Sequence, residues 1–187
     1  MSRSNGPISM GTWFSGTAGA CSERHWMRDI KCSFHLDHRQ ISWLRCDGIG
    51  SIAAFSGQKH GRGTPKAVDQ TDIGPIPKGT YYLVDRQSGG RLGFIYDLWG
   101  EYGWGTTDQK KWFALWNPSS GDTTMINGVR RGNFRLHPMG PARLSKGCIT
   151  IVHPSDFNRL ERHLRSRNPD LPVPGTTLKA YGTVEVR

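Results

Sequence analysis

The sequence predicts a mainly β protein, a β-sandwich or partial barrel with one peripheral helix. The chain of 187 residues contains 24 Gly and 11 Pro, more than ordinary usage, which favours many turns. Its apolar segments are short and rich in aromatic and β-branched residues, as strands are. Convincing helical spacing of apolar residues occurs only over residues 155–165. A chain of this length can form one domain with a sizeable core.

The first predicted strands follow a polar N-terminal arm. Residues 1–20 are rich in Ser, Gly and Thr, so we expect a flexible arm before a single domain over residues 21–187. Apolar and polar residues then alternate, and Asp47-Gly48 is a favoured hairpin dipeptide. The strands predicted here span residues 32–36, 41–46 and 51–55.

Residues 56–79 form a polar, glycine-rich connection that is too long for an ordinary turn, which predicts a functional loop. Aromatic and β-branched residues predict further strands after it, with turns at Gly89-Gly90 and Asn127-Gly128. These strands span residues 80–84, 92–98, 112–116 and 133–137.

The C-terminal part contains the predicted helix. A strand over residues 148–152 precedes Ser155, a good N-cap residue. One face of the helix is apolar, through Phe157, Leu160 and Leu164. The opposite face is expected to point outward, with Arg159, Arg162 and Arg165. Three prolines between residues 168 and 176 end the helix, and residues 178–186 are expected to form a closing strand.

The formal charge of +10 suits any polyanion, whether nucleic acid, anionic lipid or an acidic bacterial wall. Its cations are scattered except in residues 130–135 and 159–167, so an ordinary solvated surface explains them equally well. No apolar run approaches the ~20 residues that span a bilayer. The N-terminus also lacks the apolar centre of a secretory signal peptide. We therefore expect neither membrane insertion nor classical export.

His137 and Cys148 are the candidate catalytic pair. They lie near the ends of two predicted strands joined by a tight loop, so their side chains can meet. A neighbouring imidazole lowers the pKa of a thiol and later returns the proton to a leaving amine. Gly147 permits close approach of a substrate carbonyl, and backbone N–H groups around it can form an oxyanion hole. Because a lone Cys is more often a buried structural residue, the surrounding motif decides.

Two motifs resemble those of the L,D-transpeptidases. In that family an upstream His precedes a Ser-x-Gly-Cys loop, here Ser145-Lys146-Gly147-Cys148. Residues 74–81, Gly-Pro-Ile-Pro-Lys-Gly-Thr-Tyr, resemble the Thr-Pro-x-Gly-x-Phe stretch of the same family. Together with His137-Pro138 they are most similar to the L,D-transpeptidase-like toxins delivered by type VI secretion systems. The resemblance implies an L,D-transpeptidase-like fold, Cys148 as nucleophile, His137 as base, and Ser145 and Gly147 in the catalytic loop.

The chain departs from that pattern near the nucleophile. Typical members carry His where this chain has Lys146, and Asn or Arg where it has Thr150. We therefore expect nearby cationic side chains to bind the substrate carboxylate in place of the family's usual residues. His60 of the long connection is expected to contact the substrate as well. The candidate substrate-binding residues are Lys146, Arg143, Arg135, Thr150 and His60.

The resemblance implies an attack on peptidoglycan tetrapeptide stems. The carbonyl of the third stem residue acylates Cys148, and the terminal D-alanine is lost. Water then gives a tripeptide, a free D-amino acid gives an exchanged stem, and a second stem gives a 3-3 crosslink. Because the loop after His137 is short and basic, we expect an open site in which L,D-carboxypeptidase and exchange activity outrun crosslinking. In that family a backbone carbonyl orients the base His, so no acidic partner is required.

The resemblance also implies where such an antibacterial effector acts. A protein made in the cytoplasm without a signal peptide is expected to reach the target's periplasm on a secretion-system carrier. The producing cell then needs an immunity protein that covers the active site. Neither a cofactor nor a metal ion is expected.

The three other cysteines, Cys21, Cys32 and Cys46, lie near several histidines, which raises the possibility of a zinc site. Cys32 and His35 fall on opposite faces of the predicted strand and no Cys-x-x-Cys pair exists, so we discount zinc. A disulfide between two of the three suits an oxidising periplasm, and buried free thiols are an equal alternative.

Two functions from other classes compete with this interpretation. A basic nucleic-acid-binding module is supported by the charge and by the aromatics Trp112, Phe113 and Trp116, but leaves Ser-x-Gly-Cys unexplained. A papain-like cysteine peptidase or amidase usually places its Cys at a helix start, before the His in sequence. Here Cys148 follows His137 and begins a predicted strand.

Overall fold

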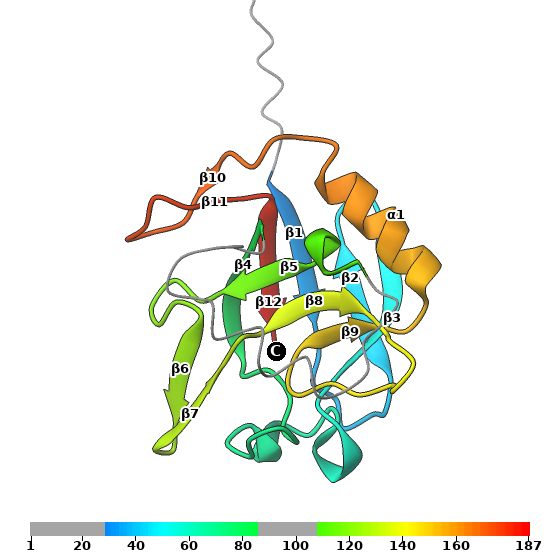
Figure 1. The fold of residues 1–187 in the computed structure, drawn as a ribbon, viewed down its shortest axis with the longest axis vertical. Coiled ribbons are helices and arrows are strands. Elements are labelled where there is room, and N and C mark those ends of the chain that lie inside the picture. Colours follow the sequence, from blue (N-terminus) through cyan, green and yellow to red (C-terminus); the bar gives the residue numbers. More distant parts are fainter. Residues whose placement is uncertain (1–28, 86–107) are drawn as a thin grey trace, which may run out of the picture.

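The computed structural model describes residues 29–85 and 108–187, and within them eight strands close into a barrel (Figure 1). The strands are β1 (Ile30–Phe34), β2 (Ser42–Cys46), β3 (Gly50–Ser56), β4 (Gly79–Asp85), β5 (Phe113–Trp116), β8 (Arg135–Pro138), β9 (Ile149–Ile151) and β12 (Gly182–Val186). Their order around the barrel is β1-β12-β4-β5-β8-β9-β3-β2. The predicted fold class, mainly β with one peripheral helix, is confirmed, and the sheet closes completely.

Neighbouring strands run antiparallel except at two places, where β1 pairs with β12 and β8 pairs with β9 in parallel. The predicted alternation is confirmed, since Cys32, Phe34 and Leu36 are buried while Ser33 is half-buried and His35 and Asp37 are exposed. Strand β1 itself ends at Phe34, two residues earlier than predicted. The predicted Asp47-Gly48 turn joins β2 to β3 with Gly48 at φ 75°. Positive φ is the conformation that glycine adopts without steric cost.

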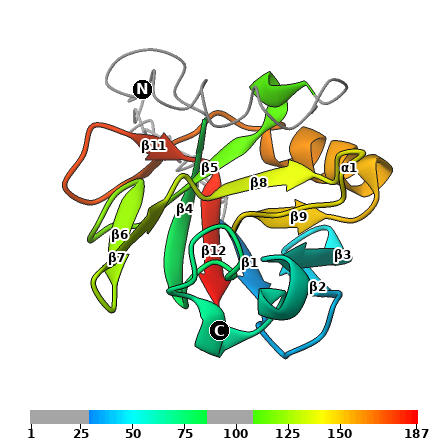
Figure 2. The same cartoon turned by 60° about the horizontal axis from the view of Figure 1, so that its bottom comes forward.

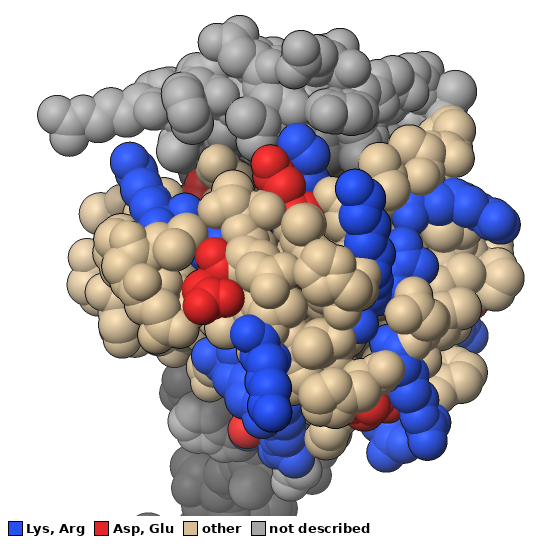
Figure 3. All heavy atoms as spheres, turned by 90° about the horizontal axis from the view of Figure 1, so that it is seen from below, with Lys and Arg blue, Asp and Glu red and all other residues tan. Residues whose placement is uncertain are grey.

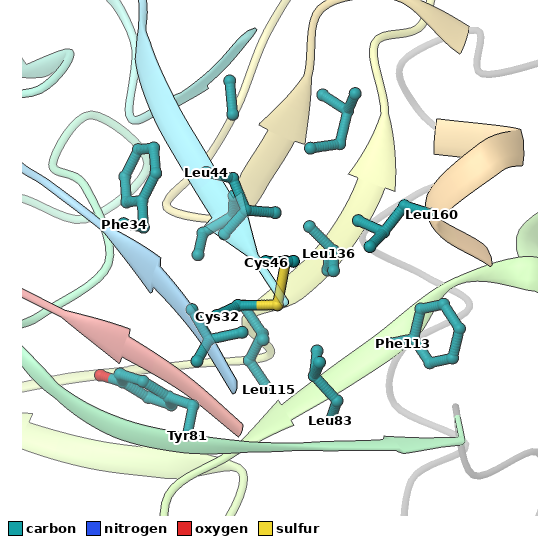
Figure 4. Close-up of a cluster of buried hydrophobic side chains, with 14 of the residues drawn as sticks. Cys32, Phe34, Leu44, Cys46, Tyr81, Leu83, Phe113, Leu115, Leu136 and Leu160 are labelled. Atoms are coloured by element: carbon teal, nitrogen blue, oxygen red, sulfur yellow. A yellow bond between two sulfur atoms is a disulfide. The ribbon is translucent and has the colours of Figure 1, made fainter. Parts of the chain in front are cut away.

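The barrel interior is filled by large aliphatic and aromatic side chains, which form one cluster (Figure 4). Within it, a disulfide joins Cys32 to Cys46, which oppose one another on β1 and β2. Helix α1 (Pro154–Leu164) packs beside β8 and β9 at the periphery of the barrel (Figures 1 and 2). Its predicted apolar face, Phe157, Leu160 and Leu164, is buried in the same cluster.

Two predictions about this helix are wrong. Its N-cap is His153, and Ser155 lies inside the first turn, because Pro154 occupies the first helical position, which proline favours. Arg165 does not point into solvent. Its guanidinium pairs with Asp85 at 2.6 Å and lies 4.8 Å from the centre of the Phe113 ring.

Other elements also differ from expectation. A hairpin of β6 (Thr123–Ile126) and β7 (Val129–Gly132) surrounds the predicted Asn127-Gly128 turn, but its strands were not predicted. The closing strand is split at Tyr181 into β11 (Lys179–Ala180) and β12, and β11 pairs with β10 (Leu171–Pro172). The predicted arm over residues 1–20 and the predicted strand over 92–98 lie outside the described residues.

Candidate active site

Parallel strands β8 and β9 bring the two candidate catalytic segments together. The register sets His137 opposite Thr150, and Cys148 comes directly before β9. Leu136 and Ile149 belong to the barrel core, so His137 and Thr150 point to the other face of the sheet. Cys148 lies two positions before Thr150 along the same chain, so the nucleophile candidate and the base candidate are on neighbouring segments.

The imidazole of His137 is fully buried and held on three sides. Its ring stacks on Trp112 with 4.6 Å between ring centres. Nδ1 lies 2.8 Å from the carbonyl oxygen of Pro138, and Nε2 lies 3.2 Å from the hydroxyl of Thr150. A carbonyl oxygen only accepts, so Nδ1 carries the proton, and the lone pair of Nε2 accepts the hydrogen bond from the Thr150 hydroxyl. This is the arrangement of a base whose orientation is set by a backbone carbonyl.

Burial keeps His137 neutral. The loss of hydration lowers its pKa to about 4, an effect that the hydrogen bond to Pro138 only partly offsets. At neutral pH Nε2 is therefore unprotonated.

The thiol of Cys148 is also buried, with 4% of the residue exposed, and it is not in a disulfide. Burial raises its pKa to about 11. The backbone N–H of Arg135 and the charges of Arg135 and Arg131 oppose that rise, whereas the charge of Asp122 adds to it. The structure therefore places a neutral thiol and a neutral imidazole in the candidate site. The expectation of an open site is wrong, because both side chains are shielded.

The loop over residues 139–148, called the nucleophile loop after the candidate nucleophile Cys148, is held in shape by serine hydroxyls. Ser145 is buried, and its Oγ donates to the carbonyl oxygen of Cys148 at 2.8 Å. Ser56, at the end of β3, donates to the carbonyl oxygen of Gly147 at 3.1 Å and accepts from the N–H of Ile76 at 2.8 Å. These bonds link both sequence motifs, and they give Ser145 the role of fixing the backbone next to the thiol.

Gly147 is required by both conformation and space. Its φ of 112° lies in the region that favours glycine. A Cβ on this residue would lie 2.5 Å from Nη2 of Arg131 and 2.9 Å from the Phe134 ring. The backbone before Cys148 is therefore packed directly against an arginine and an aromatic ring.

The long connection, residues 56–79, contacts this loop. It contains two short turns of 3-10 helix, η1 (Lys59–Gly61) and η2 (Pro65–Ala67). Arg62 donates to the carbonyl oxygen of Arg143 at 3.0 Å, and Lys146 pairs with Asp72 at 3.7 Å. Lys and Arg side chains predominate over acidic ones on the face of the molecule that includes this region (Figure 3).

The predicted substrate-binding residues divide into two groups. Arg143 is exposed and Lys146 is partly exposed, both on the nucleophile loop, while His60 is exposed and bonded to Gln70 within the connection at 2.8 Å. Arg135 is buried, and its guanidinium binds both carboxylate oxygens of Asp122 at 2.5 and 2.9 Å. Thr150 is fully buried against His137. Arg135 and Thr150 are therefore buried within the candidate site, where their side chains bind Asp122 and His137.

Three residues of the site were not identified from the sequence. In the sequence Trp112 is one of several aromatic residues, Asp122 belongs to no motif, and Arg131 stands in a run of basic residues. Arg131 is 4% exposed, and its guanidinium donates to carbonyl groups on both sides of the site. The sequence Val-Arg-Arg-Gly over Val129–Gly132 has no apolar alternation, so nothing in it distinguishes buried Arg131 from exposed Arg130.

Among residues 29–85 and 108–187, no group of three His, Cys, Asp or Glu side chains is placed to hold a metal ion. In the same part of the chain, no helix has the length and apolar character needed to cross a bilayer.

Comparison with known proteins identifies the family. A model of the Tlde1 domain matches residues 50–176, which is more than half of the chain and includes both motifs and every residue of the site described above. No curated protein matches the sequence. The chain therefore belongs to the Tlde1 domain family, type VI secretion L,D-transpeptidase effectors that enter target cells and act as antibacterial toxins on peptidoglycan.

Proposed function

We propose that this protein cleaves and exchanges the ends of peptidoglycan tetrapeptide stems through an acyl-enzyme on Cys148. The observation that carries the proposal is the buried, neutral His137. Its Nδ1–H donates to the carbonyl oxygen of Pro138, and its basic Nε2 lies 3.2 Å from the hydroxyl of Thr150, two residues after Cys148. A base with this tautomer can take the thiol proton without first losing one of its own.

The proposed reaction has two balanced steps. Nε2 of His137 accepts the thiol proton, and Sγ of Cys148 attacks the carbonyl of the third stem residue. The C–S bond forms, the amide C–N bond to D-alanine breaks, and the imidazolium returns its proton to the leaving amine. In the second step His137 accepts a proton from water or an amine, which attacks the thioester carbonyl. The new C–O or C–N bond forms, the C–S bond breaks, and the imidazolium returns its proton to the Cys148 thiolate.

The shielding of Cys148 favours small acceptors. With 4% of Cys148 exposed, water or a free D-amino acid reaches the thioester more easily than a second bulky stem. L,D-carboxypeptidase and exchange activity are therefore expected to exceed crosslinking. The sequence led to the same expectation from an open site, whereas here it follows from a shielded one. Exposed Arg143 and partly exposed Lys146 are proposed to bind stem carboxylates, with His60 as a further contact.

The proposed place of action is the periplasm of the target cell. The Cys32–Cys46 disulfide supports this compartment, because such bonds persist in oxidising environments. We also propose a secretion-system carrier and an immunity protein that covers the connection and the nucleophile loop.

The test is to incubate purified disaccharide tetrapeptide with the protein, with and without D-methionine, and to identify the products by mass. Tripeptide with free D-alanine, and a mass-shifted tetrapeptide when D-methionine is present, are expected. Dominant 3-3 dimers would contradict the acceptor preference and retain Cys148. An untouched stem would contradict the proposed function as a whole.

A further inference from the structure

Arg131 is a buried cation held by main-chain oxygens. It lies in β7 and is 4% exposed. Its Nη1 donates to the carbonyl oxygen of Val68, and its Nη2 donates to those of Gly74 at 3.0 Å and Lys146 at 3.4 Å. The first two carbonyls belong to the long connection and the third to the nucleophile loop. One guanidinium therefore joins the two segments that contain the family motifs.

The two buried arginines of the site differ in their counter-charges. Arg135 is neutralised by Asp122, with a shortest N–O distance of 2.5 Å. Within the described ranges 29–85 and 108–187, by contrast, no carboxylate lies within ion-pair distance of Arg131. The charges of Asp72 and Asp69 stabilise the cation from beyond that distance. Burying a cation without a directly paired carboxylate is costly, and an anion that forms beside it recovers part of that cost.

The position of Arg131 indicates that the anion is the Cys148 thiolate. Nη2 packs on Gly147, the residue before Cys148, where a Cβ would lie 2.5 Å away. The guanidinium carbon is also 5.5 Å from the centre of the Phe134 ring, which limits its movement. A negative charge on the sulfur of Cys148 would therefore form next to a cation that is already fixed in place.

We propose that Arg131 is a positioning residue that holds the nucleophile loop against the connection and supplies the counter-charge for the Cys148 thiolate. This inference rests on the proposed function of Cys148. When the thiol proton passes to Nε2 of His137, the sulfur becomes negative while Arg131 keeps its proton. On acylation the sulfur loses that charge, so the stabilisation applies to the attacking thiolate.

Other charged and titratable groups also act on this thiol. The charge and backbone N–H of Arg135 favour the thiolate, and Asp122 opposes it. His137 takes the proton. Arg131 opposes the effect of burial on the pKa of Cys148 in the same direction as Arg135. The influence of Arg131 on the thiol is smaller than that of Arg135. Because Asp122 offsets the charge of Arg135, however, removal of Arg131 is still expected to make the thiolate less stable.

The experiment measures the rate of Cys148 alkylation by iodoacetamide between pH 7 and 10 in the whole protein. Arg131→Gln keeps hydrogen-bond donors but removes the charge. An opposite charge at close range shifts a pKa by about one to three units, so alkylation at each pH should fall at least about tenfold. The kcat for stem cleavage should fall as well, with KM changing less. An unchanged or faster alkylation of folded Arg131→Gln would overturn the proposal.

Two further variants separate charge from structure. Arg131→Lys retains the charge, so its alkylation rate should stay within about threefold of wild type, and a tenfold loss would contradict the electrostatic role even if Arg131→Gln does not fold. Arg165→Gln is the matched control, because Arg165 also packs on an aromatic ring and joins separate elements, at Asp85 and Phe113. It should lower Tm and leave alkylation of Cys148 unchanged. If wild-type protein alkylates normally but leaves stems intact, the proposed function fails while these rates still decide the role of Arg131.

Discussion

The hydroxyl of Thr150 lies 3.2 Å from Nε2 of His137. Since Nδ1 of His137 donates to the carbonyl oxygen of Pro138, the Thr150 hydroxyl must be the donor in this contact. In the resting site the basic nitrogen Nε2 therefore accepts a hydrogen bond from Thr150, and this bond fixes the plane of the ring. The sequence placed Thr150 among the substrate contacts, and the structure gives it a different partner.

Thr150→Val should weaken both stability and activity. Valine has a similar shape but leaves a buried imidazole nitrogen without its hydrogen bond, which costs about 1–3 kcal/mol. Stem cleavage should slow because the ring is no longer held. Thr150→Ser retains the hydroxyl and serves as the control. Urea unfolding and product analysis test this, and a Thr150→Val protein equal to wild type in both would contradict the role of the hydroxyl.

Gly147→Ala should abolish stem cleavage. A Cβ here would meet Nη2 of Arg131 and the Phe134 ring, and φ is 112°. The loop must shift, which moves the adjacent Cys148 away from its position beside Arg135.

Gly175→Ala is the matched control for that variant. Gly175 also has a positive φ, 71°, but nothing lies within 4 Å of its added Cβ. It should cost only about 1–2 kcal/mol from backbone conformation and leave the rate of stem cleavage unchanged. Equal activity of Gly147→Ala and Gly175→Ala would show that close packing at Gly147 is unimportant.

The strands of the barrel could be predicted wherever one face is buried. Alternation in β1 and β2 and the Asp47-Gly48 turn indicated the first hairpin correctly. The hairpin of β6 and β7 was missed because most of its side chains are exposed or half-buried, so no apolar pattern marks it. Closure of the barrel depends on the parallel pairing of β1 with β12, a contact between distant parts of the chain that local patterns do not encode.

The motifs indicated where the site residues lie but not what surrounds them. His137 and Thr150 are opposite one another because β8 and β9 are parallel neighbours. Nothing in the sequence distinguishes Arg131 from its basic neighbours. Its buried position depends on the carbonyl groups of Val68, Gly74 and Lys146, which are distant from it along the chain.

The two buried site residues predict a stability maximum between about pH 6.5 and pH 9. The pKa of His137 falls from 6.5 to about 4 on folding, so between these values the unfolded chain binds the extra proton. The free energy of unfolding therefore decreases as pH falls through this range, by about 3 kcal/mol. The pKa of Cys148 rises from 9.0 to about 11, so the unfolded chain loses its proton first. Stability decreases again as pH rises above 9.

Urea unfolding at a series of pH values measures both limbs. Cys148→Ala should flatten the alkaline limb, and His137→Asn should flatten the acid limb between about pH 6.5 and pH 4.5, above the range in which most carboxylates titrate. If each variant keeps the wild-type pH dependence, the two side chains do not titrate as buried groups.

The Cys32–Cys46 disulfide should stabilise the barrel. It closes a short loop, with a sequence separation of 14, and a loop of this size contributes about 3 kcal/mol. A thiol-free reductant should lower the urea midpoint of wild-type protein and have no effect on the Cys32→Ala/Cys46→Ala double variant. Cys21→Ala is the control. A wild-type midpoint that resists complete reduction would contradict a stabilising role for the bond.

The central claim is that Cys148 becomes acylated by a peptidoglycan stem. The most direct measurement is the intact mass of the protein after brief incubation with disaccharide tetrapeptide and an acid quench, followed by peptide mapping. Wild-type protein should carry the disaccharide tripeptide as a thioester on Cys148. His137→Ala should form the adduct far more slowly, and Cys148→Ala should form none and release no D-alanine. Release of D-alanine by folded Cys148→Ala, or an adduct on another residue, would contradict the account.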